Sequence, residues 1–195
     1  MADTADKGPD YPIANQLDVA IKPVEDRVVL IAGTKGHGRR GLLLTRRLMK
    51  SLLGQYAQVL ERTSETAAQA AAGHKAEVLQ MEHVAARSQG EPDGGEGGRA
   101  GGESEQQVSA VYLATGVHCE PRDSQILLAF DGVRRDVHDP NATTAAPALA
   151  FVLDRTTAHK VLAMLQDKAD EAGWDLAKPS GWTDRLQPAT ASEVN

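Results

Sequence analysis

A run of eighteen residues near the middle of the chain most strongly limits what the sequence can fold into. Residues 88–105 contain seven glycines and five acids, and Pro92 is their one apolar residue larger than alanine. Such a segment buries too little surface to offset the conformational entropy that ordering would cost. We therefore predict a disordered linker over residues 88–107, with a structured half of the chain on either side.

The half before the linker has the pattern of three strands and a helix. Residues 17–22 alternate between apolar and polar, residues 27–32 are rich in β-branched side chains, and a glycine-rich connection leads to a third strand at 42–44. Thr45 is a good helix N-cap, and the leucines behind it recur at helical spacing. A weaker helical pattern over 63–87 predicts a further helical segment before the linker.

The half after the linker repeats this order. Strands are expected at 108–118, 124–130 and 148–153, and Asp154 is placed to cap a helix over 155–172. The third strand runs into a capping residue followed by arginine in both halves. The pattern therefore predicts an internal repeat of the type βββα.

Two such units predict an α+β fold in which one six-stranded antiparallel sheet carries both helices on one face. Because an antiparallel sheet leaves free edges, a homodimer formed by edge pairing is a reasonable expectation. The expected boundaries are a flexible leader at 1–15, a single domain at 16–176 and a loose tail at 177–195. Within the domain the repeats cover about 17–62 and 108–174.

Composition indicates a cytoplasmic protein without a membrane partner. No stretch approaches the roughly 18 apolar residues that cross a bilayer, and the first ten residues are polar and acidic, unlike a secretory signal. Cys119 is the single cysteine, so an intrachain disulfide is excluded and a reducing compartment fits.

The distribution of charge is uneven. The chain carries a net charge of −6, yet residues 27–60 contain no acid and seven lysines and arginines. Two arginines fall in the first turn of the helix behind Thr45, where the helix dipole disfavours cations. An anionic partner would relieve this, and six residues are nominated as its binding site: Lys35, Arg39, Arg40, Arg46, Arg47 and Lys50.

Three interpretations of these cations compete. They can be solvated or paired within the domain, for example with Glu77, Glu82 or the acidic linker. They can contact an acidic protein surface, including another copy of this chain. They can bind nucleic acid, although the overall acidity and the scarcity of aromatic residues near the patch weigh against this.

No catalytic residue, metal site or cofactor can be nominated. His118 and Cys119 are adjacent, but neighbours on a strand point to opposite faces, so the imidazole is poorly placed to activate the thiol. The glycine-rich connection at 33–41 lacks the Gly-Lys-Ser/Thr of a phosphate-binding loop and joins two strands. An enzyme using His138 and the acids of the loop at 131–147 is a third possibility.

The sequence thus favours a non-catalytic binding or assembly module. Its basic hairpin and helix N-terminus would contact an acidic protein partner or another copy of the chain, with nucleic-acid binding through the same patch as the alternative.

Overall fold

The computed structural model describes residues 10–71, 73–89, 108–135 and 143–183. Its elements follow the chain in this order: β1 (Ile13–Lys22), η1 (Pro23–Glu25), β2 (Arg27–Thr34), β3 (Gly38–Leu44), α1 (Arg46–Arg62), α2 (Glu65–Gln69), α3 (Lys75–Ser88), β4 (Val108–Arg122), β5 (Gln125–Arg134), β6 (Ala145–Asp154), α4 (Arg155–Glu171) and η2 (Gly181–Thr183). The fold is therefore of mixed α and β character. The predicted linker lies, from residue 90 on, outside the described residues.

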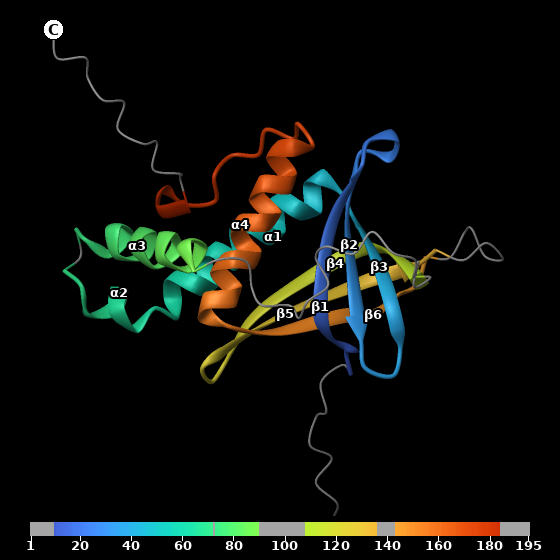
Figure 1. The fold of residues 1–195 in the computed structure, drawn as a ribbon, viewed down its shortest axis with the longest axis horizontal. Helices are drawn as coiled ribbons and strands as arrows, with labels where there is room; N and C mark the ends of the chain where they lie inside the picture. Colours follow the sequence, from blue (N-terminus) through green and yellow to red (C-terminus); the bar gives the residue numbers. More distant parts are fainter. Residues whose placement is uncertain (1–9, 72, 90–107, 136–142, 184–195) are drawn as a thin grey trace, which may run out of the picture.

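The six strands form a closed barrel in the order β1 to β6 (Figure 1). Within each half the strands pair antiparallel, but β3 pairs with β4 in parallel and β1 pairs with β6 in parallel. The prediction of an antiparallel sheet with helices on one face is therefore wrong. The reason is geometric: when two three-stranded meanders close into a ring, the first strand of each meets the last strand of the other. These strands run in the same direction.

The closure joins the two edge strands to each other along part of their length, which leaves less free edge for the expected edge-paired dimer; that dimer stays a prediction. The seam between β1 and β6 is short, with Ile13 registered opposite Ala150 and Ala14 opposite Phe151. The amide of Ala150 also donates to the carbonyl of Pro12 at 2.9 Å. β1 begins at Ile13, so the last three residues of the predicted leader belong to the barrel.

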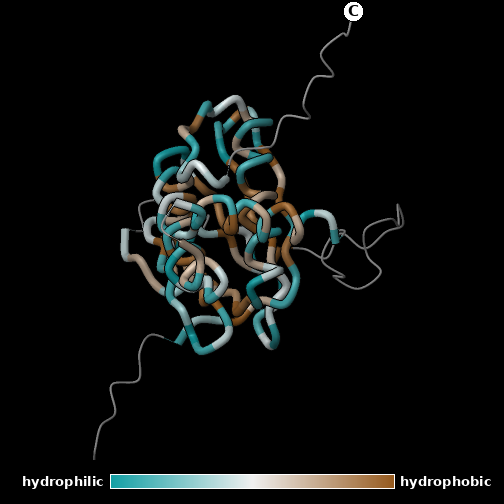
Figure 2. The backbone as a smooth tube through the Cα atoms, turned by 90° about the vertical axis from the view of Figure 1, so that its left-hand side faces the viewer, coloured by the Kyte–Doolittle hydropathy of each residue, from teal (hydrophilic) through white to brown (hydrophobic). Residues whose placement is uncertain are grey.

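Strand alternation fills the barrel with aliphatic side chains. Val28 and Leu30 on β2 and Leu42 and Leu44 on β3 are almost fully buried in the main core, whereas Leu43, between the two on β3, faces outward. Hydrophobic stretches of the chain gather in the middle of the molecule, and turns at the periphery are hydrophilic (Figure 2).

The helices lie together at one end of the barrel, against the long β4–β5 hairpin (Figure 1). Thr45 and Asp154 act as the predicted N-caps: Thr45 Oγ1 accepts from the amide of Leu48 at 3.2 Å, and the Asp154 carboxylate accepts from the amide of Thr157 at 2.8 Å. The buried faces of α1 and α4 join the barrel interior in one core. The predicted helical segment at 63–87 contains α2 and all of α3 except its last residue, Ser88, which the sequence pattern assigns to the linker.

After α4 the chain turns back over the helices. Gly173 has φ of +68°, which glycine adopts without strain, and the buried Trp174 follows it. The Trp174 indole Nε1 donates to the Asp26 carboxylate at 2.5 Å, which ties this turn to the β1–β2 connection. Trp182, in the tail predicted to be loose, is buried against His83 and His159.

Candidate functional site

The N-terminus of α1 carries three of the six nominated cations. Arg46 and Arg47 open the helix, Lys50 lies one turn further on, and the first turn contains no acid. Each of the three residues is exposed. Because α1 has 17 residues and a regular Thr45 cap, its dipole adds partial positive charge where these side chains already concentrate it.

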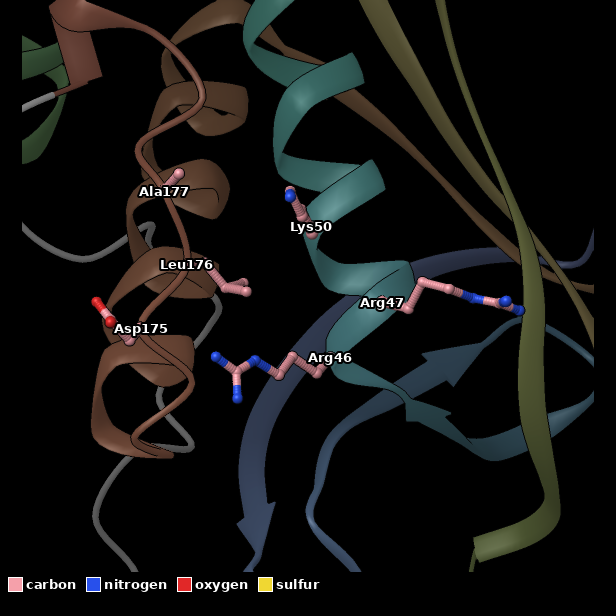
Figure 3. Close-up of a pocket in the computed structure, with 6 residues that line it drawn as sticks. All are labelled: Arg46, Arg47, Lys50, Asp175, Leu176 and Ala177. Carbon is pink, nitrogen blue, oxygen red and sulfur yellow. The ribbon is translucent and has the colours of Figure 1, made fainter.

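A hollow of about 420 Å³ opens beside these cations. Its lining consists of Arg46, Arg47, Lys50, Asp175, Leu176 and Ala177. In Figure 3 the side chains of Arg46 and Lys50 extend on the side of the returning segment, and Arg47 extends the other way, on the side where the strands lie. The turn at Gly173 creates the hollow, because it brings residues 175–177 back beside the start of α1.

Within the described parts of the chain, the Arg46, Arg47 and Lys50 side chains make no hydrogen bond or ion pair. Two acids suggested by the sequence as internal partners are engaged elsewhere: the Glu77 carboxylate lies 2.8 Å from Nδ1 of His74, and Glu82 pairs with Arg155 at 2.6 Å. Neutralisation of the patch by these two glutamates is therefore ruled out. The acidic linker lies outside the described residues.

The other nominated residues lie at the opposite end of β3. Seven strand residues at about 3.3 Å each separate the hairpin from the helix by roughly 20 Å. Arg39 pairs with Asp18 at 2.8 Å, and Lys35 lies in the β2–β3 turn. A second hollow of about 500 Å³ is lined there by Asn15, Gln16, Gly33, Thr34, Lys35, Gly38 and Arg39. The nominated residues therefore do not form one site: some line a hollow at the start of α1, and others line a separate hollow at the far end of β3.

Arg40 is not part of either hollow. It lies on the inward side of β3, where its guanidinium donates to the carbonyl of Ala148 on β6 at 2.5 Å and lies 5.4 Å from the centre of the Tyr112 ring. The cation therefore braces the barrel interior between strands that are not neighbours. These contacts do not support its nomination as a residue for an external anion.

The His118–Cys119 pair is divided between the two faces of β4. The His118 imidazole is on the outer surface, with Nε2 2.7 Å from the Asp131 carboxylate, whose other oxygen accepts from the Tyr11 hydroxyl at 2.9 Å. Cys119 packs against the core. Burial, followed by the charge of Glu120, raises the pKa of the thiol to about 12. This cysteine is therefore not an activated nucleophile.

Register irregularities on both sides of Asp131 explain its position. The ladders slip between Ala114 and Gly116 on β4 and between Phe130 and Asp131 on β5. A Cβ on Gly116 would lie 3.3 Å from Asp131 Oδ2, so the small residue allows the close approach. Tyr11 also packs on the outer cluster of Leu127, Ala129 and Ala150. The arrangement fastens the segment before β1 to the barrel.

Two buried histidines form a contact that sequence reasoning missed. His83 on α3 and His159 on α4 approach to 3.3 Å between their Nδ1 atoms, although they are separated by 76 positions. No local spacing signals such a pair. The described residues contain no group of three or more His, Cys, Asp or Glu side chains that could hold a metal ion.

Residues 136–142 of the loop proposed for an enzyme, including His138, lie outside the described residues, so that possibility stays a prediction. Among the described helices, none is both long and apolar enough to cross a membrane. Comparisons with protein-family models, curated proteins and solved structures found no match to this chain.

Proposed function

We propose that this chain is a non-catalytic binding module that contacts an acidic segment of a partner protein through Arg46, Arg47 and Lys50. The observation that carries the proposal is that these three exposed cations line an open hollow at a helix N-terminus without an ion pair to any described residue. A carboxylate there would gain from the dipole of α1 and from the arginine side chains together.

The comparison between Arg46 and Arg155 supports this assignment. Each is the first residue of its helix, directly after the N-cap. Arg155 is neutralised by Glu82 and donates to the carbonyl of Leu60 at 2.8 Å, so it serves the fold. Arg46 has no such described partner. We propose that the two βββα halves are copies of one unit, in which this arginine is structural in one copy and free to bind in the other.

An acidic protein is favoured over nucleic acid for two reasons. No aromatic side chain is among the residues lining the hollow, so a platform for stacking bases is missing there. The remainder of the chain is acidic, with a net charge of −6 for the whole protein, and would repel a long polyanion. The single Cys119 supports a reducing, cytoplasmic setting for the module.

The test is fluorescence anisotropy of the full chain with a labelled decaglutamate peptide at low salt. The variant Arg46→Gln/Arg47→Gln/Lys50→Gln is expected to lose the binding. A matched control, Lys22→Gln/Lys75→Gln/Arg122→Gln, removes the same charge from other exposed positions and should keep it. If both variants lost decaglutamate binding to the same extent, the binding would depend only on the net charge of the protein, which would contradict the proposal.

Two further measurements separate the rivals. Tighter binding of a twelve-nucleotide single strand than of decaglutamate, with a salt slope of about 0.7 per phosphate contact, would assign the site to nucleic acid. Light scattering on the unmodified chain identifies self-association. An oligomer that the triple variant alone converts to a monomer would make the partner another copy.

A further inference from the structure

The outer surface of the barrel carries a row of apolar side chains across four strands. Val29 is registered opposite Leu43, Leu43 opposite Leu113, and Leu113 opposite Val133. The strand neighbours of Leu43 are Leu42 and Leu44, which belong to the main core, so alternation directs Leu43 outward. The four row members belong to neither hydrophobic cluster of the structure.

A second row lies beside the first. Ile31 is registered opposite Gly41, and Gly41 opposite Val111, again on the outward side. Together the rows form the outer apolar strip, which consists of Val29, Ile31, Leu43, Val111, Leu113 and Val133. Val29 and Val133 are each 7% exposed, and the other members are half-buried. The half-buried members Ile31, Leu43, Val111 and Leu113 therefore supply most of the accessible surface of the strip.

Basic residues border this strip. Arg27 lies two residues before Val29 on β2, and Arg39 lies two residues before Gly41 on β3, so both share its outward face. The amide of Arg135 donates to the carbonyl of Val111 at 2.8 Å, which places Arg135 at the end of the second row. Arg39 is paired with Asp18, which is registered opposite Ile31, so Arg27 and Arg135 are the border cations without an ion pair to a described residue.

The strip also adjoins the proposed site. Leu43 precedes Arg46 by three residues, and the side chain of Arg47 extends on the side of the strands (Figure 3). Four strands about 4.8 Å apart span about 15 Å between the outer two, which is wide enough for the 10–12 Å diameter of one helix. A second copy of this chain would bring its own arginines against these, so like charges disfavour a symmetric pairing.

We infer that the outer apolar strip binds an amphipathic helix of the partner, whose apolar side chains lie on Leu43 and Leu113 and whose acidic flanks face the bordering arginines. This rests on the proposed function, because it extends the same acidic contact at the start of α1. It adds the class of partner: an acidic amphipathic helix rather than an unstructured acidic tail.

Two labelled peptides of eighteen residues test this on the full chain. They carry equal numbers of glutamates, and one has leucines at positions i, i+3, i+4 and i+7 that the other replaces with serine. The leucine peptide is expected to bind at least tenfold more tightly. The variant Leu43→Thr/Leu113→Thr should abolish that difference and retain the binding of the serine peptide. Val24→Ser/Met81→Ser, at apolar residues 100% and 71% exposed elsewhere, should retain the difference.

Ile31→Thr/Val111→Thr provides a second variant, because threonine keeps the β-branched shape and the strand propensity. It should reduce the difference in affinity between the leucine peptide and the serine peptide severalfold. Equal binding of the two peptides to the unmodified chain would overturn this inference and leave the proposed function standing. Binding of neither peptide, with no decaglutamate binding, would overturn both. Preference for anionic vesicles over the leucine peptide, lost with the same leucines, would reassign the strip to a membrane surface.

Discussion

Nδ1 of His83 lies 3.3 Å from Nδ1 of His159, so only one of these two atoms carries a proton in a hydrogen bond between the neutral rings. His159 Nε2 lies 3.6 Å from the Glu82 carboxylate, beyond hydrogen-bond distance, and the tautomer with its proton on that side leaves Nδ1 as the acceptor. His83 is then the donor. The Trp182 ring packs edge-on against both imidazoles and encloses the pair between α3, α4 and η2.

This buried pair predicts a loss of stability in acid. Burial and the neighbouring arginines lower the pKa of each imidazole to about 4, against an ordinary value of 6.5. Between these values the unfolded chain binds protons that the folded chain does not. The free energy of unfolding therefore has its full value above pH 6.5 and falls by about 1.4 kcal/mol per pH unit for each histidine as the pH drops toward 4.

Urea unfolding from pH 7.5 to pH 4 measures this slope. His159→Gln, which removes one titrating ring, should make it shallower, whereas His37→Gln, in the exposed β2–β3 turn, should leave it unchanged. The charges around the pair are Glu82, Arg87, Arg155 and Asp167. An unmodified chain whose stability is flat over this range would show that the histidines are accessible to protons in the folded state.

The second prediction concerns the contact between Arg155 and Glu82. Burial alone would raise the pKa of the Glu82 carboxyl, but hydrogen bonds from Arg155 and Ser64 outweigh it and lower the pKa. Arg155 also donates to Thr63 Oγ1 at 3.0 Å, so it joins α3 and the end of α1 to α4. Arg155→Ala should lower the free energy of unfolding by about 2 kcal/mol, because it strips a partly buried carboxylate of its cation.

Thermal and urea unfolding of two variants check this value. Lys168→Ala removes an ion pair with Glu171 of similar length, 2.7 Å, on the exposed face of α4. Surface pairs of this kind contribute less than about 1 kcal/mol. Similar effects of Arg155→Ala and Lys168→Ala would mean that the Arg155 network does not hold α3 in place.

At the start of α1, unlike at Arg155, removal of an arginine should stabilise the fold. Arg46→Glu replaces a cation with an acid at a helix N-terminus, and we expect it to raise the free energy of unfolding by about 0.5 kcal/mol while abolishing decaglutamate binding. Lys168→Glu, in the last turn of α4, is the electrostatic mirror and should destabilise. A destabilising Arg46→Glu would indicate that Arg46 has a structural partner.

Local patterns predicted the elements well, because their causes are local. Thr45 and Asp154 cap their helices as expected, since a side-chain acceptor three residues before an amide needs no distant contact. Barrel closure was missed because it depends on the β1–β6 seam, which involves two registered pairs far apart in sequence. Strand patterns alone do not distinguish an open sheet from a ring.

The candidate site was predicted in part for the same reason. Charge segregation nominated the whole basic segment, and it could not separate Arg40, which turns into the barrel, from Arg46, which faces a hollow. That distinction depends on the register between β3 and its neighbours. Residues 175–177 complete the hollow because the chain reverses direction at Gly173. No sequence motif predicts that this reversal brings them beside the start of α1.

Cys119 provides the last prediction. With a thiol pKa of about 12, it holds about a thousandfold less thiolate at pH 8 than an ordinary cysteine. A thiolate of higher pKa is also more nucleophilic, which offsets part of this loss. Reaction with a disulfide reagent should therefore be about tenfold to a hundredfold slower in the native protein than in denaturant, and it should follow unfolding as urea is added. His118→Ala should not change the native rate, because the imidazole lies on the outer face beside Asp131. A native thiol that reacts rapidly, and slows when His118 is removed, would restore the catalytic pair that the geometry excludes.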